Sequence, residues 1–138
     1  DVCSSDLILL IAGVLEDEKL KELYEIAYEK GLECLVEVHS QAELEELLTC
    51  FTPKIIGVNN RNLKTFETSL EQTEALSTLI PEGSLFVSES GIHTASDVDR
   101  VYKAGANGIL VGESLMRAAS PKEGIEKLFG GQSVANKA

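Results

Sequence analysis

Basic residues are scarce in this sequence. Twelve Lys and Arg residues stand against 23 Asp and Glu residues in a chain of 138, which gives a formal net charge of −11. Nucleic-acid-binding proteins neutralise phosphates with a Lys/Arg surface, so this balance argues against a nucleic-acid partner. It leaves room for a local anion site built from backbone N–H groups.

Long apolar runs are also lacking. The longest, from Leu7 to Leu15, is about half of the ~20 residues that a membrane-spanning helix needs, so we expect no membrane partner. The N-terminus is acidic and no basic leader precedes this run, which is unlike a secretory signal peptide.

Cysteine and histidine are few. Cys3, Cys34 and Cys50 are an odd number without paired spacing, which favours reduced thiols in a cytoplasmic protein over a disulfide or zinc framework. His39 and His93 lack the spacing of metal ligands, so we expect turn or capping roles for them and no metal site.

What the sequence does have is a regular alternation of short apolar runs and amphipathic segments. Five strands are predicted, at Ile8–Ala12, Cys34–His39, Ile55–Asn59, Leu85–Ser88 and Ile109–Val111. Helices are predicted at 17–30, 41–51, 70–80, 95–104 and 121–129, with one further helical turn at 114–117. Units recurring at roughly 20 to 30 residues are typical of βα repeats with a parallel sheet.

Several helix starts carry local signals. The segments Ser40–Glu43 and Ser69–Gln72 both match the capping box, and Thr94 and Ser120 are predicted N-caps. We expect Ile80 and Tyr102 on the buried faces of their helices.

Two α/β architectures fit this pattern, and no internal domain boundary is visible. One is an open doubly wound sheet, and the other is part of a (β/α)8 barrel. A complete barrel has eight units and about 250 residues, so five units are too few to close one.

Polar side chains recur where the predicted strands end. They are Glu37, His39, Asn59, Arg61, Glu89, Ser90, Glu113 and Ser114. In a parallel sheet these ends lie on one side, where the groups can converge on one ligand. One such residue alone is more often a satisfied polar group, but four strand ends in succession favour a shared site.

Two glycine turns follow the last two strands. Gly91 and Gly112 each stand between a strand and a helix start, where backbone N–H groups favour an anion. Paired turns of this kind form the usual barrel phosphate site, although Gly also serves in plain tight turns. Glu37 lies in an apolar strand, where an inward position raises a carboxyl pKa; the alternative is a carboxylate paired with Arg61.

The segments ILLI, LVEVH, IIGVNNRNLKTFE, LFVSESGIHTASDV and ILVGESLMRA, in this order, resemble the indole-3-glycerol-phosphate synthase family from about Ile8 to Phe129. The resemblance implies a partial (β/α)8 TIM barrel of parallel strands, made of five consecutive βα units, the last five of eight. It implies a carboxy-lyase of tryptophan biosynthesis, without a cofactor. Such an enzyme closes the ring of 1-(2-carboxyphenylamino)-1-deoxyribulose 5-phosphate with loss of carbon dioxide and water.

The resemblance also implies roles for individual residues. Glu37, Asn59, Glu89 and Ser90 match catalytic positions, Leu9 and Arg61 match substrate-binding positions, and Gly91, Gly112 and Glu113 match phosphate-binding positions. Leu9 corresponds to an apolar residue against the anthranilate ring. The family's earlier strands supply a further Glu and two lysines, one of them the general acid, and Lys19, Lys21 and Lys30 lie on a predicted helix that cannot replace them. We therefore expect a fragment without turnover, whose partners are a phosphorylated substrate and the missing amino-terminal barrel units. Exposed apolar surface and an unpaired first strand should mark where those units pack.

We expect three segments along the chain. Residues 1–7 read as a non-native leader, such as a translated adapter, 8–129 as the partial barrel domain, and 130–138 as a disordered tail. Two alternatives remain open. One is another phosphate-binding barrel enzyme, of the phosphoribosylanthranilate isomerase or tryptophan synthase alpha type. The other is a non-catalytic α/β binding module, which would need an acidic cluster that Ala12–Val14 does not supply.

Overall fold

The computed structural model describes residues 7–62, 64–111 and 120–129. Its strands are β1 (Leu7–Ile11), β2 (Glu33–Val38), β3 (Ile55–Asn59), β4 (Leu85–Glu89) and β5 (Gly108–Leu110). Its helices are α1 (Asp17–Glu29), α2 (Gln41–Cys50), α3 (Glu71–Ser77), α4 (Ala95–Ala104) and α6 (Pro121–Phe129). All five predicted strands are present, each displaced by no more than one residue at either end.

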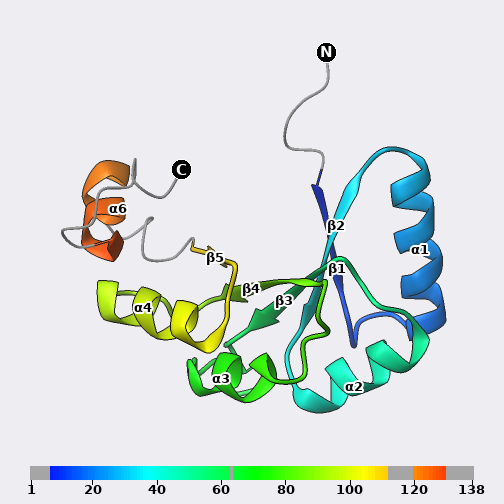
Figure 1. The fold of residues 1–138 in the computed structure, drawn as a ribbon, viewed down its shortest axis with the longest axis horizontal. Helices are drawn as coiled ribbons and strands as arrows, with labels where there is room; N and C mark the ends of the chain where they lie inside the picture. Colours follow the sequence, from blue (N-terminus) through cyan, green and yellow to red (C-terminus); the bar gives the residue numbers. More distant parts are fainter. Residues whose placement is uncertain (1–6, 63, 112–119, 130–138) are drawn as a thin grey trace.

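One parallel sheet holds these strands in the order β1-β2-β3-β4-β5. Each strand lies beside the next in the chain, and helices α1 to α4 follow one another in an arc around one side of the sheet (Figure 1). Right-handed crossovers that all advance in one direction place every helix on the same face, as in a barrel. A doubly wound sheet reverses its strand order, so that alternative is wrong.

The two faces of the sheet differ in burial. Side chains that point toward the helices are fully buried in the core, among them Cys34, Val36, Val38, Ile56 and Val58. Alternate residues point to the opposite face.

Four leucines on that opposite face are about half exposed: Leu7 at 51%, Leu9 at 49%, Leu85 at 52% and Leu110 at 51%. We call these four residues the uncovered leucines. Among the described residues β1 pairs with β2 alone and forms one edge of the sheet. The expectation of exposed apolar surface and of an edge at the first strand is confirmed.

Three helix starts follow their local signals. Thr94 and Asp97 form a complete capping box at α4. The Ser120 hydroxyl accepts from the backbone N–H of Glu123 at α6. At α2 only half of the predicted box forms, because Ser40 accepts from Glu43 N–H while the Glu43 carboxylate turns back to the N–H of His39.

The predicted capping box at Ser69 is wrong. Helix α3 begins at Glu71, and the residue before it, Leu70, is itself helical. Ser69 accepts from the Glu71 N–H, and the Gln72 side chain donates instead to the His39 carbonyl. The His39 carbonyl, which is distant in the sequence, therefore binds the Gln72 side chain that the local capping box would use.

Two burial predictions also change. Tyr102 is 42% exposed, because the buried face of α4 is formed by Val98 and Val101. Helix α3 ends at Ser77, so Ile80 lies beyond it and is half-buried against the core.

Some predictions fall outside the described residues. They concern Gly112, Glu113, the helical turn at 114–117, the tail at 130–138 and residues 1–6 of the expected leader. Leu7, the last residue of that expected leader, pairs with Glu33 as the start of β1. No helix within the described ranges has the length and apolar character to cross a membrane.

Candidate active site at the strand ends

The ends of β2, β3 and β4 bring three polar side chains onto the face away from the helices. Strand register pairs Glu37 with Gly57 and Asn59 with Glu89. Partners in parallel register point to the same face, so the two carboxylates and the amide lie side by side. Glu37 is 4% exposed and Glu89 is 3% exposed, which places both carboxyl groups out of bulk water.

Asn59 links β2 to the following loop. Its Nδ2 donates to Glu37 Oε1 at 2.5 Å, and its Oδ1 accepts from the backbone N–H of Arg61 at 3.0 Å. A short bond to a carboxylate is charge-assisted and strongly orienting. Asn59 therefore holds Glu37 in place and sets the direction in which the chain leaves β3.

Glu89 occupies a space that exists because residue 57 is glycine. A Cβ built on Gly57 would overlap Glu89 Oε2 and would lie 3.2 Å from Leu35 Cδ1. Among the described residues Glu89 Oε2 has no hydrogen-bond partner. Burial, followed by the negative charge of Glu37, raises the pKa of the Glu89 carboxyl to about 8. At neutral pH this group keeps its proton and can donate it.

A strained turn follows Glu89. Ser90 and Gly91 have φ angles of 70° and 73°, and Ser90 is one of two non-glycine residues with positive φ in the described chain. Side-chain-bearing residues in this region cost energy and gather at functional sites. At Gly91 a Cβ would lie 2.9 Å from Thr68 Cβ, so glycine is required there for conformation and for space.

The imidazole of His39 lies beside the carboxylates. Its Nε2 is 3.9 Å from Glu37 Oε1, and its Nδ1 is 3.7 Å from Glu43 Oε1. The side chain is 8% exposed, and Nδ1 is buried without a hydrogen-bond partner among the described residues. His39 thus lies closer to the site than a turn or capping role requires. Both histidines also take part in helix caps, because the His39 N–H donates to Glu43 and the His93 N–H donates to Asp97.

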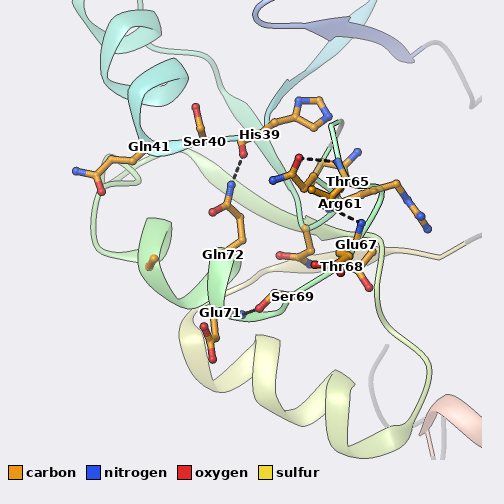
Figure 2. A pocket seen from close by; sticks show the side chains of 14 residues that line it. His39, Ser40, Gln41, Arg61, Thr65, Glu67, Thr68, Ser69, Glu71 and Gln72 are labelled. Atoms are coloured by element: carbon orange, nitrogen blue, oxygen red, sulfur yellow. Dashed lines mark hydrogen bonds between the residues drawn. The ribbon is translucent and has the colours of Figure 1, made fainter.

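A cavity of about 580 Å³ adjoins His39 and Asn59; Glu37 and Glu89 do not line it. Residues after β2, the loop after β3 and the start of α3 line it; Figure 2 shows Gln72 pointing across it toward His39. The loop is braced internally, with Arg61 Nη1 donating to the Phe66 carbonyl at 2.9 Å. Arg61 and Thr68 are bridged across the base of this loop.

The comparison with protein-family models identifies the family to which this chain belongs. The model of indole-3-glycerol phosphate synthase matches residues 1–128. The chain belongs to the indole-3-glycerol phosphate synthase family. The five sequential parallel strands are consistent with part of the (β/α)8 barrel of that family.

Curated relatives of this synthase family agree. Indole-3-glycerol phosphate synthase of Halalkalibacterium halodurans is 60% identical over 134 residues, which cover 97% of this chain and 52% of the relative. The synthase of Shouchella clausii is 60% identical over 91% of this chain and 49% of its own length. That of Priestia megaterium is 58% identical over 96% and 52%. The chain thus spans about half the length of the curated relatives it matches.

Solved structures share the fold at lower identity. A thiamine phosphate pyrophosphorylase from Pyrococcus furiosus superposes with a TM-score of 0.65 at 21% identity, over 89% of this chain and 57% of that one. The Amycolatopsis orientalis BexX/CysO complex matches with a TM-score of 0.54 at 20% identity, over 86% of this chain and 53% of that chain. At this identity the likeness concerns the fold alone.

The remaining predicted site residues fall at different places. Leu9 lies on the same sheet face as Glu37 and is half exposed. Gly112 and Glu113 lie outside the described residues, so the second half of the expected phosphate site rests on the family resemblance. No group of three His, Cys, Asp or Glu side chains within the described part of the chain is arranged to hold a metal ion.

Sequence reasoning overlooked Gly57 and Asn60. A lone glycine inside the apolar run Ile55–Val58 marks a close approach of another group, and this signal was available. The side chain of Asn60 points away from Asn59, toward the helices, where it is 4% exposed. No local pattern distinguishes these two adjacent asparagines except strand alternation.

Proposed function

We propose that this chain contributes the carboxyl-terminal half of an indole-3-glycerol-phosphate synthase active site. The reaction is the ring closure of 1-(2-carboxyphenylamino)-1-deoxyribulose 5-phosphate with decarboxylation and dehydration, a carbon–carbon lyase reaction. The observation that carries the proposal is the meeting of Glu37, Asn59 and Glu89 on one sheet face within a chain of that family.

The two carboxyl groups suit different tasks. Glu89, with its pKa raised to about 8, carries a proton at neutral pH that it can donate to a leaving hydroxyl. Glu37, held by the Asn59 amide, supplies the carboxylate that stabilises a cationic intermediate. In paired carboxyl groups, different environments commonly leave one group protonated as an acid and the other ionised as a charge stabiliser.

Binding groups surround this pair. Asn59 and Arg61 hold the substrate's hydroxyls and carboxylate, and Leu9 contacts its aromatic ring. The turn at Ser90 and Gly91 offers backbone N–H groups to the phosphate, together with Gly112 and Glu113. The enzyme works in the cytoplasm without a cofactor.

We further propose that the 138-residue chain has no turnover by itself. The general-acid lysine of the family comes from earlier strands of the barrel, and Lys19 and Lys21 lie on helix α1 and not on a strand. The uncovered leucines other than Leu9 form the surface on which those earlier units pack.

Joining the chain to the amino-terminal half of the Halalkalibacterium halodurans relative tests this proposal. Half-chains of one family at 60% identity should share their packing surfaces. We expect the chimera to form indole-3-glycerol phosphate, detected by indole fluorescence, and the chain alone to form none. A folded chimera without activity would refute the proposed reaction, and turnover by the chain alone would refute its dependence on the other half.

Two variants of the chimera refine the test. Glu89→Gln keeps the shape of the side chain and removes the titrating proton, so kcat should fall about 100-fold or more. Glu33→Gln, at the opposite end of β2, is the matched control and should retain activity. Equal rates in the two variants would remove Glu89 from the mechanism.

A further inference from the structure

Asn60 joins the ends of β3 and β4 through two adjacent carbonyl groups. Its backbone N–H donates to the carbonyl of Glu89 at 2.8 Å, and its side-chain Nδ2 donates to the carbonyl of Ser90 at 3.0 Å. One residue thus holds the carbonyl groups on both sides of the Ser90 Cα. These are the groups whose orientation defines the strained turn.

The Asn60 amide is itself fixed by buried hydroxyls. Its Nδ2 also donates to Ser88 Oγ at 3.0 Å, and its Oδ1 accepts from Thr73 Oγ1 at 2.7 Å and from Thr73 N–H at 3.2 Å. The two hydroxyls are 2.6 Å apart. Ser88 and Thr73 are completely buried, so water does not compete for these bonds. A fully connected buried network of this kind specifies one geometry.

The strain at Ser90 requires such a device. A serine at positive φ persists only where its surroundings enforce the conformation. The chain on one side of Ser90 carries the buried Glu89 carboxyl, and on the other side Gly91 lies where Thr68 leaves no room for a Cβ. A relaxed turn would move both neighbours at once.

We propose that Asn60 is a positioning residue for the synthase reaction. It holds the Ser90–Gly91 turn in its strained form and thereby keeps the Glu89 carboxyl over Gly57 and the Gly91 N–H toward the phosphate. This inference rests on the proposed function, but its structural part concerns the 138-residue chain alone.

Two readouts separate the parts of this proposal. In the isolated chain, NMR follows the Cα and Cβ shifts of Ser90, which report φ, and the titration of the Glu89 carboxyl carbon. In the chimera, kcat and KM report the chemistry. If the wild-type chimera is inactive, the proposed function fails, and the NMR measurement still decides whether Asn60 holds the turn.

Asn60→Asp keeps the shape and replaces the donor by a carboxylate oxygen that repels the Ser90 carbonyl. We expect Ser90 to move toward negative φ, and the Glu89 titration midpoint to fall as its carboxyl gains water. In the chimera, kcat should fall about 10- to 100-fold, the usual cost of a small misplacement. Asn60→Ser, which is too short to reach Ser90, should act in the same direction.

Asn107→Ser is the matched control. Asn107 Oδ1 accepts from Phe86 N–H near the other end of β4, so its loss weakens the same strand without touching the turn. Its NMR signals at Ser90 and its kcat should match wild type. Folded Asn60 variants with wild-type Ser90 shifts and kcat would overturn the proposal. Failure of both Asn60 variants to fold at 10 °C would also overturn it, since Asn60 would then serve the fold as a whole.

Discussion

The carboxyl group of Glu89 lies over Gly57, in the space that a Cβ at residue 57 would fill. Gly57 stands in register with Glu37 on one side and with Val87 on the other, so it separates the two carboxylate strands. Because residue 57 of β3 has no side chain beyond a hydrogen atom, the acidic side chains of Glu37 on β2 and Glu89 on β4 can approach each other. The consequences of this arrangement can be measured.

Replacing Gly57 tests the arrangement directly. Gly57→Ala displaces the Glu89 carboxyl, because the overlapping atom is the far end of a flexible side chain. We expect a loss of about 1–3 kcal/mol in the free energy of unfolding, typical of overpacking, and a fall in the Glu89 pKa. Urea unfolding and carboxyl NMR measure the two effects. Gly108→Ala is the control, since its Cβ would meet Val87 Cγ2 at an ordinary 3.9 Å; equal losses would contradict the role of Gly57.

The raised pKa of Glu89 predicts a pH dependence of stability. Between its ordinary value of 4.5 and about 8, the folded chain binds a proton at Glu89 that the unfolded chain has released. This contribution is fully present below pH 4.5 and is lost as the pH rises through 8. Urea midpoints at pH 5 and pH 8.5 should differ less in Glu89→Gln than in wild type. An unchanged difference would show that Glu89 titrates normally.

Gly91 should be less replaceable than other glycines with positive φ. Gly83 has φ of 99° with no atom within 4 Å of an added Cβ, so Gly83→Ala reports conformational strain alone, about 1–2 kcal/mol. Gly91→Ala adds a contact of 2.9 Å with Thr68 and should cost at least about 1 kcal/mol more. The difference between the two unfolding free energies is the measurement. A difference near zero would mean that Thr68 gives way freely.

Replacing Asn59 should lower the rate of the reaction strongly, because its amide holds two other groups of the site. Asn59→Ala releases the Glu37 carboxylate and leaves the Arg61 N–H without its acceptor. In the chimera we expect kcat to fall about 100-fold or more, as for other lost preorganised donors. Asn107→Ala serves as the control at the far end of the sheet. Wild-type kcat in Asn59→Ala would exclude a role for this amide.

The uncovered leucines should bind an apolar dye in the isolated chain. Leu9→Lys combined with Leu85→Lys should lower the fluorescence of bound anilinonaphthalene sulfonate severalfold, because both side chains lie on the face away from the helices. Tyr102→Lys is the control, an exposed residue on α4 at the helical side. In the chimera the dye should no longer bind, and dye binding that persists there would place the apolar surface elsewhere.

Much of the fold follows from local spacing. Short apolar runs predicted each strand to within one residue at either end, and the side chains of Ser40, Thr94 and Ser120 cap their helices as predicted. The capping box at Ser69 failed because the Gln72 side chain reaches His39, a residue 33 positions away. The prediction that Tyr102 is buried was wrong because Val98 and Val101 form the buried face of α4.

The sequence by itself determined the strands and helices, the caps at Ser40, Thr94 and Ser120, and the polar side chains at the strand ends, since these depend on residues only a few positions apart. The sequence also indicated the family, through segments such as VNNRNL and SESGI. The tertiary structure alone decided which of two architectures forms, because strand order depends on how segments pair over tens of residues. It likewise decided that Glu89 carries the raised pKa. The pKa shift arises because the Glu89 carboxyl is buried and lies near the negative charge of Glu37. The register of β2, β3 and β4 brings these two side chains together across Gly57.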